Sequence, residues 1–265
     1  MTKQHDPRGR IASADPWYTD DQFRTQLRTP GRRRMIEDRW RRFERMIHTW
    51  LGSVHPLQMG RRLQVLDAGC GDGINLVGLA RIAEANGWSA DLVGVDYNPL
   101  RTGRAGQRGP GANIVEASLH QLPWRGGVFD VVLCNHVLEH VPDLDAVLSE
   151  LHRVLGARGL FIAGVPNEGC LMGRLRNRVL QRSIGRTTDH VHFFTAATFA
   201  AVIARAGFIN VRVERETFFF PCSYANVVCS EFRTGHALMD LLRRCFPSQA
   251  GGLCISAVKP GAHGG

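Results

Sequence analysis

The stretch that decides the fold is Val65-Leu66-Asp67-Ala68-Gly69-Cys70-Gly71-Asp72-Gly73. A short apolar run ends here in an acid and three alternating glycines, and a segment with helical character follows over 75–85. A second apolar run then ends in another acid, Asp96. This order predicts a strand, a tight glycine loop, a helix and a second strand that ends in a carboxylate. Such an arrangement is half of a doubly wound nucleotide-binding fold.

The glycine loop matches neither common phosphate-binding motif. A dinucleotide fingerprint needs Gly or Ala where this chain has Ile74, and no Gly-Lys-Ser/Thr follows as in a phosphate loop. The Asp67 carboxylate disfavours a pyrophosphate and favours a cationic ligand. The glycines let a ligand lie against bare backbone, and Asp96 can accept hydrogen bonds from both ribose hydroxyls. S-adenosylmethionine meets these needs because it joins adenosine to a sulfonium and an ammonium without a phosphate.

On these residues the chain resembles the class I S-adenosylmethionine-dependent methyltransferases. Asp67, Gly69, Gly71 and Gly73 are similar to the family's first motif, and Asp96 to its ribose-binding acid. The resemblance implies a Rossmann-like α/β fold with a doubly wound, mostly parallel seven-stranded sheet in the order 3-2-1-4-5-7-6, the seventh strand being antiparallel. It also implies S-adenosylmethionine as cofactor and S-adenosylhomocysteine as product. The alternative, a chance glycine-rich turn, is disfavoured by the strand contexts and the later motifs.

Later segments add residues to the expected cofactor site. Tyr97 suits stacking on the adenine face, with ordinary surface burial as the alternative. Residues 117–124 resemble the family's adenine-edge segment, but Ser118 stands where most members have Asp, so the Leu119 backbone amide is expected to contribute more. Asn135 is expected near the methionine portion. The predicted cofactor-binding residues are Asp67, Gly69, Cys70, Gly71, Gly73, Asp96, Tyr97, Ser118, Leu119, Asn135 and Tyr18.

Two histidine-containing segments supply candidates for a catalytic base. Residues 135–141 resemble the family's V-L-E-H-V signature, in which His140 is the obvious base because imidazole titrates near neutral pH. Since the signature occurs in members with different substrates, His140 could instead order the loop. Residues 189–195 resemble the family's H-x-x-F-T element beside the acceptor pocket. His190 or His192 could therefore deprotonate a hydroxyl, or the segment could serve only as a capping loop.

No metal site is expected from the sequence. Some quinone-type members of the family are thought to use a metal around the pair matching Glu139 and His140, but a third ligand is not evident. His190 and His192 point the same way in an extended segment, yet two ligands are an incomplete site. The motifs of base N-methyltransferases and of cytosine-C5 enzymes are absent. Cys222 follows the sixth expected strand and is expected to be a buried thiol.

Composition limits the class of protein. A chain of 265 residues with 44% hydrophobic content can bury one α/β core with helical additions. The polar N-terminus lacks the apolar segment of a signal peptide, and no apolar run is long enough to cross a bilayer. Seven cysteines without a C-x-x-C pair indicate neither a disulfide framework nor a zinc knuckle. A reduced, cytoplasmic compartment is therefore expected.

The net charge of +9 is not read as a sign of nucleic-acid binding. Only two of the 33 basic residues are lysine, a bias that a GC-rich genome explains as readily as phosphate recognition. The runs Arg32-Arg33-Arg34 and Arg41-Arg42 are typical of the solvated face of a helix. The expected partner is a small-molecule acceptor rather than a nucleic acid.

The chain is expected to divide into an N-terminal arm and helix over 1–61 and a methyltransferase domain over 62–260. Residues 1–30, with a breaker at Pro30-Gly31, are expected to form a loose arm. Its Trp17-Tyr18 pair resembles the lid aromatics of related enzymes and is expected to close over the cofactor. Strands are expected at 63–67, 91–96, 112–116, 129–135, 159–165, 209–214 and 253–258. Helices are expected at 32–51, 75–85, 144–155 and, capped by Thr195, at 196–206.

Two segments, 166–194 and 217–251, lie outside this alternation and are expected to form the acceptor site. Insertions after sheet strands lie at the carboxyl edge, where ligands bind in such sheets. The second segment opens with Phe218-Phe219-Phe220, and together the two indicate a pocket with an apolar floor and a cationic rim. The alternative for the first segment is an amphipathic surface helix. Its arginines are Arg174, Arg176, Arg178, Arg182 and Arg186.

The predicted reaction is in-line transfer of the sulfonium methyl group to a hydroxyl of a small-molecule or lipid-linked acceptor that carries an anionic group. Positioning, with His140 or His190 as a general base, is expected to supply most of the acceleration. One alternative is an N-methyltransferase acting on a small molecule. Another is an RNA-directed enzyme, or one directed to an anionic membrane surface, that uses the arginine-rich segments. A third is a regulatory protein that binds S-adenosylmethionine without activity.

Overall fold

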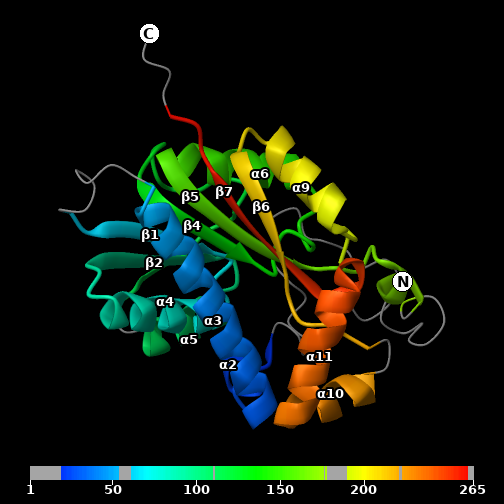
Figure 1. Cartoon of the computed structure of the whole chain (residues 1–265). Helices are drawn as coiled ribbons and strands as arrows, with labels where there is room; N and C mark the ends of the chain where they lie inside the picture. Colours follow the sequence, from blue (N-terminus) through cyan, green and yellow to red (C-terminus); the bar gives the residue numbers. More distant parts are fainter. Residues whose placement is uncertain are drawn as a thin grey trace, which may run out of the picture.

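The computed structural model describes residues 19–53, 61–109, 111–175, 177, 190–220 and 223–261, which form a twisted seven-stranded sheet with helices packed on it (Figure 1). The strands are β1 (Leu63–Ala68), β2 (Ala90–Asp96), β3 (Asn113–Glu116), β4 (Phe129–Asn135), β5 (Leu155–Pro166), β6 (Ile209–Arg215) and β7 (Gly252–Val258). The helices are α2 (Gln22–Gln26), α3 (Pro30–Leu51), α4 (Ile74–Ala85), α5 (Pro99–Arg108), α6 (Leu144–Val154), α7 (Leu171–Leu175), α9 (Ala196–Arg205), α10 (Ser223–Glu231) and α11 (Arg233–Cys245), with the 3-10 turn η3 (Pro247–Gln249).

The strand order confirms the predicted topology. The order is β3-β2-β1-β4-β5-β7-β6, with β1 to β5 parallel and β7 antiparallel to both of its neighbours. Parallel strands need crossover connections, and helices α4, α5 and α6 supply them. The chain reverses its direction of winding between β1 and β4, which pair directly. The carboxyl ends of these two strands therefore border the crevice in which open α/β sheets bind ligands.

Two apolar clusters pack on the sheet. One joins β4 and β5 to helices α6 and α9, through residues such as Leu148 and Phe199. The other joins β1 and α4 to α3, where Phe43 is completely buried. The apolar stripe of α3 recurs at helical spacing as Ile36, Trp40, Phe43, Ile47 and Trp50. Its place in the core shows that this stripe is a packing surface.

The entry to α3 corrects one expectation. Pro30 was expected to break the chain, but it is the first residue of the helix, where its missing N–H costs nothing. Thr29 caps the helix, and its side chain accepts a hydrogen bond from the Arg32 backbone N–H. Part of the expected loose arm also forms helix α2. Trp17 and Tyr18 lie outside the described residues.

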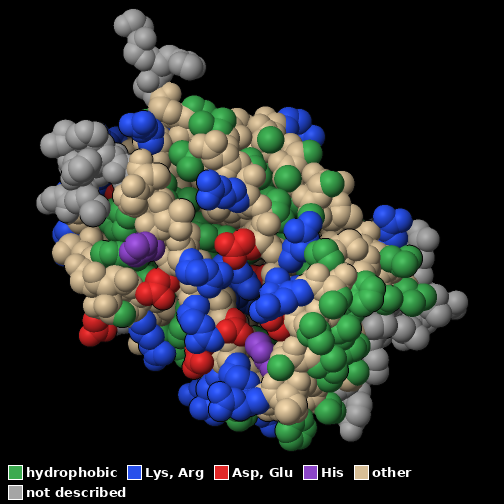
Figure 2. Space-filling model, viewed as in Figure 1, with side chains coloured by type: hydrophobic (Ala, Val, Ile, Leu, Met, Phe, Trp, Pro, Cys, Tyr) green, Lys and Arg blue, Asp and Glu red, His purple; other side chains and the backbone are tan. Residues whose placement is uncertain are grey.

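The polar face of α3 carries paired charges. Arg41 pairs with Asp38 in the same helix, while Arg42 and Arg45 reach Glu216 and Glu214 at distances of 2.8 and 3.1 Å. Figure 2 shows basic and acidic side chains interleaved on this side of the molecule. Three of the seven arginines of α3 thus pair with acids within the fold. The division of the chain at residues 61 and 62 stays a prediction.

The two insertions fold differently from each other. In the first, the structure describes residues 166–175, which include α7, and also Asn177 and residues 190–194, while four of its five arginines lie outside the described residues. The second forms helices α10 and α11, which the sequence analysis did not predict. A Cβ on Gly31 would lie 2.4 Å from the Ser230 carbonyl oxygen, so α10 packs closely on the start of α3.

Cys222 lies outside the described residues. In the described part of the chain, no helix combines the length and hydropathy needed to span a membrane.

Candidate active site

The glycine loop after β1 takes backbone conformations that side chains disfavour. Gly69 and Gly71 have φ angles of +77° and +52°, and Gly73, at +87°, caps the start of α4. A Cβ on Gly69 would also lie 2.4 Å from Val137 Cγ2, so the loop can hold its path only with glycine there. The backbone N–H groups of Gly69 and Cys70 donate hydrogen bonds to the Val95 carbonyl. These bonds fasten the loop to the carboxyl end of β2.

Asp96 sits at the end of β2 and faces the same loop. Its Oδ2 accepts a hydrogen bond from Gly71 N at 2.9 Å, and its Oδ1 accepts one from Asn98 N at 3.0 Å. Burial raises the pKa of Asp96, and these two donors oppose that rise. Each carboxylate oxygen has a further lone pair, so both remain able to accept a hydroxyl donor. Tyr97 follows with 43% of its surface exposed, a suitable position for stacking against a planar ring.

Asp67 is completely buried near the end of β1. Burial, and secondarily the charge of Asp96, raises the pKa of Asp67 to about 7, while Asn75 and Arg39 lower it. The Asn75 amide lies near enough to act on this pKa, yet neither Asp67 oxygen has a well-formed hydrogen bond within the described part of the chain. A buried carboxylate without such a donor is costly, and a bound cation would relieve that cost. The same burial, with Asp67 and Asp96, raises the pKa of the Cys70 thiol.

The remaining predicted cofactor residues flank this loop. Asn135 ends β4 and is buried, and its Oδ1 has no hydrogen-bond partner in the described residues. A Cβ on Gly164 would lie 2.1 Å from that oxygen, so glycine on β5 makes room for the amide. Ser118 is exposed and accepts a hydrogen bond from His120 N, whereas Leu119 is buried in the core. The structure therefore places Asn135 at the carboxyl end of β4, where the crevice lies, and Ser118 on the surface after β3.

The two predicted base candidates meet in the structure. His140 lies in the loop after β4, and His190 lies in the extended segment before α9. Their ring centroids are 4.6 Å apart and the rings are nearly perpendicular. The backbone N–H groups of Val191 and His192 donate hydrogen bonds to the Glu139 carbonyl oxygen at 2.8 and 3.2 Å. These backbone bonds hold the two segments against each other.

Glu168 is a residue that the sequence analysis missed. It follows β5 at the carboxyl edge, is 6% exposed, and its Oε2 lies 2.7 Å from His190 Nδ1. The only signal in the sequence was its place directly after a strand of the parallel sheet. His192 has a different contact, since its Nε2 lies 2.9 Å from the Val141 carbonyl oxygen. That bond connects the segment before α9 with the loop after β4.

A third ligand also joins the Glu139–His140 pair. One donor atom from each of Glu139, His140 and His190 lies within 4.8 Å of the others. One carboxylate and two imidazoles form a donor set that several divalent ions accept, so these residues could hold a metal. Glu139 is almost fully buried, and its Oε1 lies 3.3 Å from His136 Nδ1. The absence of a metal stays a prediction. It was based on the lack of a third ligand in the sequence, and the structure supplies a third candidate ligand in His190.

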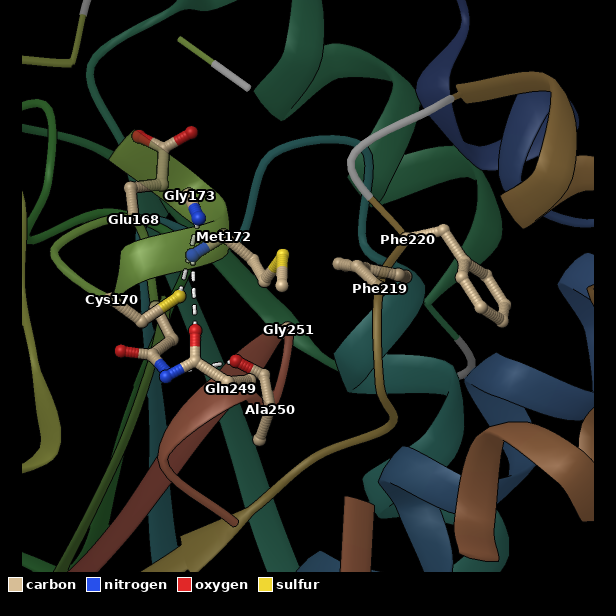
Figure 3. Close-up of a pocket in the computed structure, with 10 residues that line it drawn as sticks. Glu168, Cys170, Met172, Gly173, Phe219, Phe220, Gln249, Ala250 and Gly251 are labelled. Carbon is tan, nitrogen blue, oxygen red and sulfur yellow. Dashed lines mark hydrogen bonds between the residues drawn. The ribbon is translucent and has the colours of Figure 1, made fainter. Parts of the chain in front are cut away.

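A small cavity lies beside Glu168, between the loop after β5 and the two ends of the second insertion (Figure 3). Its volume is about 20 Å³, enough for one water molecule. Met172 and Phe219 project toward each other across it, and Gln249 Oε1 accepts a hydrogen bond from Met172 N at 3.0 Å. Phe219 thus lines a water-sized cavity that Glu168 also borders, and the apolar acceptor pocket stays a prediction. In the described residues, the one arginine of the expected cationic rim is Arg174, which donates to the Gly169 carbonyl.

Comparison with known proteins places the chain in a family. Residues 33–213 match the family described as a methyltransferase domain, and the chain belongs to it. This result confirms the class I methyltransferase resemblance that the sequence motifs carried. The chain is 28% identical over 180 residues to a probable S-adenosylmethionine-dependent methyltransferase of Mycobacterium tuberculosis, covering 66% of this chain and 58% of that protein.

A second relative is a ubiquinone biosynthesis O-methyltransferase of Psychrobacter arcticus, 29% identical over 156 residues, 55% of this chain and 58% of the relative. The chain thus spans less than two thirds of the length of these relatives. A crystal structure from Thermotoga maritima, described as a possible histamine N-methyltransferase, covers 84% of this chain and 94% of its own with a TM-score of 0.52 and 19% identity. It shows that the fold is shared. The relatives' names support S-adenosylmethionine as the cofactor.

Proposed function

We propose that the chain catalyses S-adenosylmethionine-dependent methyl transfer to a hydroxyl of a small-molecule or lipid-linked acceptor. One observation carries the proposal: the glycine loop with Asp96 and the His140–His190–Glu168 cluster lie at the carboxyl ends of adjacent strands. β1 and β4 pair in parallel, with Asp67 opposite Leu133. A cofactor on the loop would therefore present its reactive end toward the loop after β4.

The residues present fit the cofactor chemically. Asp96 has lone pairs for the ribose hydroxyls, and the buried carboxylate of Asp67 suits the ammonium group. The cofactor's carboxylate needs a cation, and Arg39 of α3 is the candidate. It is half-buried, it lies close enough to lower the pKa of Asp67, and it forms no salt bridge with any described residue. Its guanidinium can bind a carboxylate through two parallel hydrogen bonds.

When bound, S-adenosylmethionine supplies an electrophilic methyl group at its sulfonium. The protein's task is to hold the acceptor oxygen in line with that methyl group and to remove the hydroxyl proton. His190 is the proposed base. The Glu168 carboxylate accepts from Nδ1–H, which selects the tautomer with its lone pair on Nε2. The edge-to-face contact with His140 fixes the imidazole plane, and such a positioned base supplies about 10²–10⁴ in rate.

Two finer features of the acceptor belong to this proposal. Oxygen as the methylated atom is supported by the name of an O-methyltransferase among the relatives. It is also supported by the His190–Glu168 pair, which suits removal of a hydroxyl proton. The anionic group on the acceptor rests on the arginine-rich first insertion. A cytoplasmic location rests on cysteine usage, and the six cysteines of the described residues are all free thiols.

The test is identification of the methylated product. Purified protein would be given S-adenosylmethionine with a ¹³C-labelled methyl group and a total metabolite extract of its host, and the products analysed by mass spectrometry. We expect a labelled methyl group on the oxygen of a small or lipid-linked molecule. His190→Ala should lower the rate of labelling by about 10²–10⁴, and His48→Ala, on the exposed face of α3, should not change it. Label on a nitrogen would favour the N-methyltransferase alternative, and label in the RNA fraction the RNA-directed one.

A further inference from the structure

Helices α10 and α11 expose large apolar side chains to solvent. Phe232, between the two helices, is 62% exposed, and Leu241 of α11 is 56% exposed. Leu238 and Leu241 are three residues apart and so share one face of α11, while Met239 is buried against the protein. Figure 2 shows apolar side chains gathered over this part of the molecule. The exposed set, named here the α10–α11 face, consists of Val228, Phe232, Leu238, Leu241 and Phe246.

Arginine is frequent in the segments that form and adjoin this face. Residues 30–34 and 223–249, which hold the start of α3 and the helix pair, contain six arginines and two acids, Glu231 and Asp240. Both acids already have partners within the fold. Asp240 pairs with Arg243 and Arg244, and Glu231 accepts from the Gly31 backbone N–H. The segments that form and adjoin the α10–α11 face therefore carry an excess of four positive charges beside its exposed apolar side chains. The six arginines are Arg32, Arg33, Arg34, Arg233, Arg243 and Arg244.

We propose that the α10–α11 face docks on the surface of an anionic lipid bilayer. Exposed leucine and phenylalanine side chains on an amphipathic helix gain free energy by entering the interface between headgroups and acyl chains. Neighbouring arginines add attraction to anionic headgroups. Helix α11 has 13 residues, too few to span a bilayer, so it would lie in the plane of the membrane. A nucleic acid would be attracted by the arginines but would gain little from the leucine and phenylalanine side chains.

The α10–α11 face is connected to the candidate active site. The turn η3 follows α11 directly, and Gln249 in this turn accepts the hydrogen bond from Met172 N. Met172 lines the cavity that also borders Glu168 (Figure 3). Docking through α11 would therefore bring the catalytic crevice near the membrane surface, where a lipid-linked acceptor would be available. The docking itself does not depend on the proposed activity.

The experiment measures sedimentation of the full chain with vesicles. Vesicles of phosphatidylcholine and phosphatidylglycerol in a 3:1 ratio are compared with vesicles of phosphatidylcholine alone, each at low and at high salt. We expect binding to the anionic vesicles, reduced by salt because counter-ions screen the arginines. The double variant Leu238→Asp with Leu241→Asp should lower the partition coefficient by at least about tenfold. Arg233→Glu should lower it by at least about fivefold, because each basic residue near the surface contributes about 1 kcal/mol.

A matched control separates docking from general loss of apolar surface. Leu100 on α5 is 46% exposed and outside the α10–α11 face, so Leu100→Asp should leave vesicle binding unchanged. Thermal melting of each variant verifies that the fold is retained. Equal binding to both kinds of vesicle, or equal loss in the control, overturns the proposal. Size-exclusion chromatography provides a further outcome: a dimer that Leu241→Asp dissociates would show that a second copy covers this face and would also overturn it.

Discussion

The Gly71 backbone N–H donates a hydrogen bond to Asp96 Oδ2 over 2.9 Å, so the glycine loop and the acid at the end of β2 hold each other in place. The loop can approach Asp96 this closely because Gly71 adopts a left-handed conformation, with φ of +52°. The bond orients the carboxylate before any ligand arrives. Such preorganisation lowers the entropic cost of binding and makes Asp96 the first residue to test.

Asp96→Ala should weaken S-adenosylmethionine binding by about tenfold to a hundredfold, because the variant loses charged hydrogen bonds worth about 1.5–3 kcal/mol. Isothermal titration calorimetry measures this affinity. Asp91→Ala is the matched control, because Asp91 lies near the other end of β2 and pairs with Arg62 on the surface. An Asp96→Ala protein that binds as tightly as the parent would refute the assignment of the ribose site.

S-adenosylmethionine affinity should rise with pH until about pH 7 and then level off. The pKa of Asp67 is raised to about 7, so below that value the free protein carries a proton on this carboxyl. A cationic ligand favours the ionised carboxylate, so binding should release a proton below pH 7. Calorimetry in buffers of different ionisation enthalpy measures that release. Asp67→Asn should bind weakly and without proton release, and a parent protein that releases no proton at pH 6 would contradict the prediction.

The same raised pKa affects stability in the absence of ligand. The folded state keeps the Asp67 proton up to about pH 7, whereas the unfolded chain loses it near 3.8. The free energy of unfolding should therefore decrease as the pH rises from about 4 to about 7, because the unfolded chain releases the Asp67 proton over this range and the folded protein retains it. Denaturant unfolding of the parent and of Asp67→Asn at several pH values measures the difference. Parallel pH curves for the two proteins would show that Asp67 is not the group responsible.

Deletion of residues 1–18 should leave the fold intact and weaken S-adenosylmethionine binding. Gln22 N donates to Asp72 Oδ2 in the glycine loop at 2.9 Å, and Arg108 pairs with Asp21, so the chain at residue 19 is anchored beside the loop. The predicted lid residue Tyr18 directly precedes this anchor. Deletion at residue 30 would also remove the Thr29 cap of α3, so the shorter deletion is the cleaner test. Unchanged affinity, with an unchanged melting temperature, would argue against a lid.

His190→Ala should lower kcat by about 10²–10⁴ across pH 6–9 with a smaller effect on KM, because the variant loses the general base. Glu168→Gln should cost less, since the amide oxygen can still accept from Nδ1–H but carries no charge. Turnover is measured with the acceptor that the labelling experiment identifies, and His48→Ala is the control. If His140→Ala and His190→Ala both keep full kcat over this range, neither histidine is a base and positioning alone carries the reaction.

A chelator should leave kcat unchanged if His190 acts as a base. Glu139, His140 and His190 nevertheless form a donor set within 4.8 Å, so the test discriminates between two uses of the same side chains. The enzyme would be assayed after dialysis against EDTA and again after addition of Mg²⁺, Mn²⁺ or Zn²⁺. Loss of activity that one of these ions restores would assign the cluster to a cation and remove the base mechanism.

The sequence by itself determined the sheet and the loop that leaves it. The apolar runs at β1, β2 and β4 predicted strands because a strand that is buried on both faces of a parallel sheet is apolar at nearly every residue. Such a run can be recognised from neighbouring residues alone. The glycine pattern predicted the turn because only glycine tolerates its positive φ angles. The start of α3 was predicted wrongly because the sequence does not distinguish a proline that interrupts secondary structure from a proline at the first position of a helix. The structure decides between them through the Thr29 cap.

Only the tertiary structure decided which side chains act together. Glu168 and His190 are 22 residues apart in the chain, and their contact depends on how the loop after β5 meets the segment before α9. The pKa of Asp67 likewise depends on burial and on Asp96, which belongs to another strand. The packing of α10 on Gly31 brings together residues about 200 positions apart. Side-chain pairing of this kind depends on how distant segments pack against each other, whereas strands, turns and helices follow from patterns among neighbouring residues.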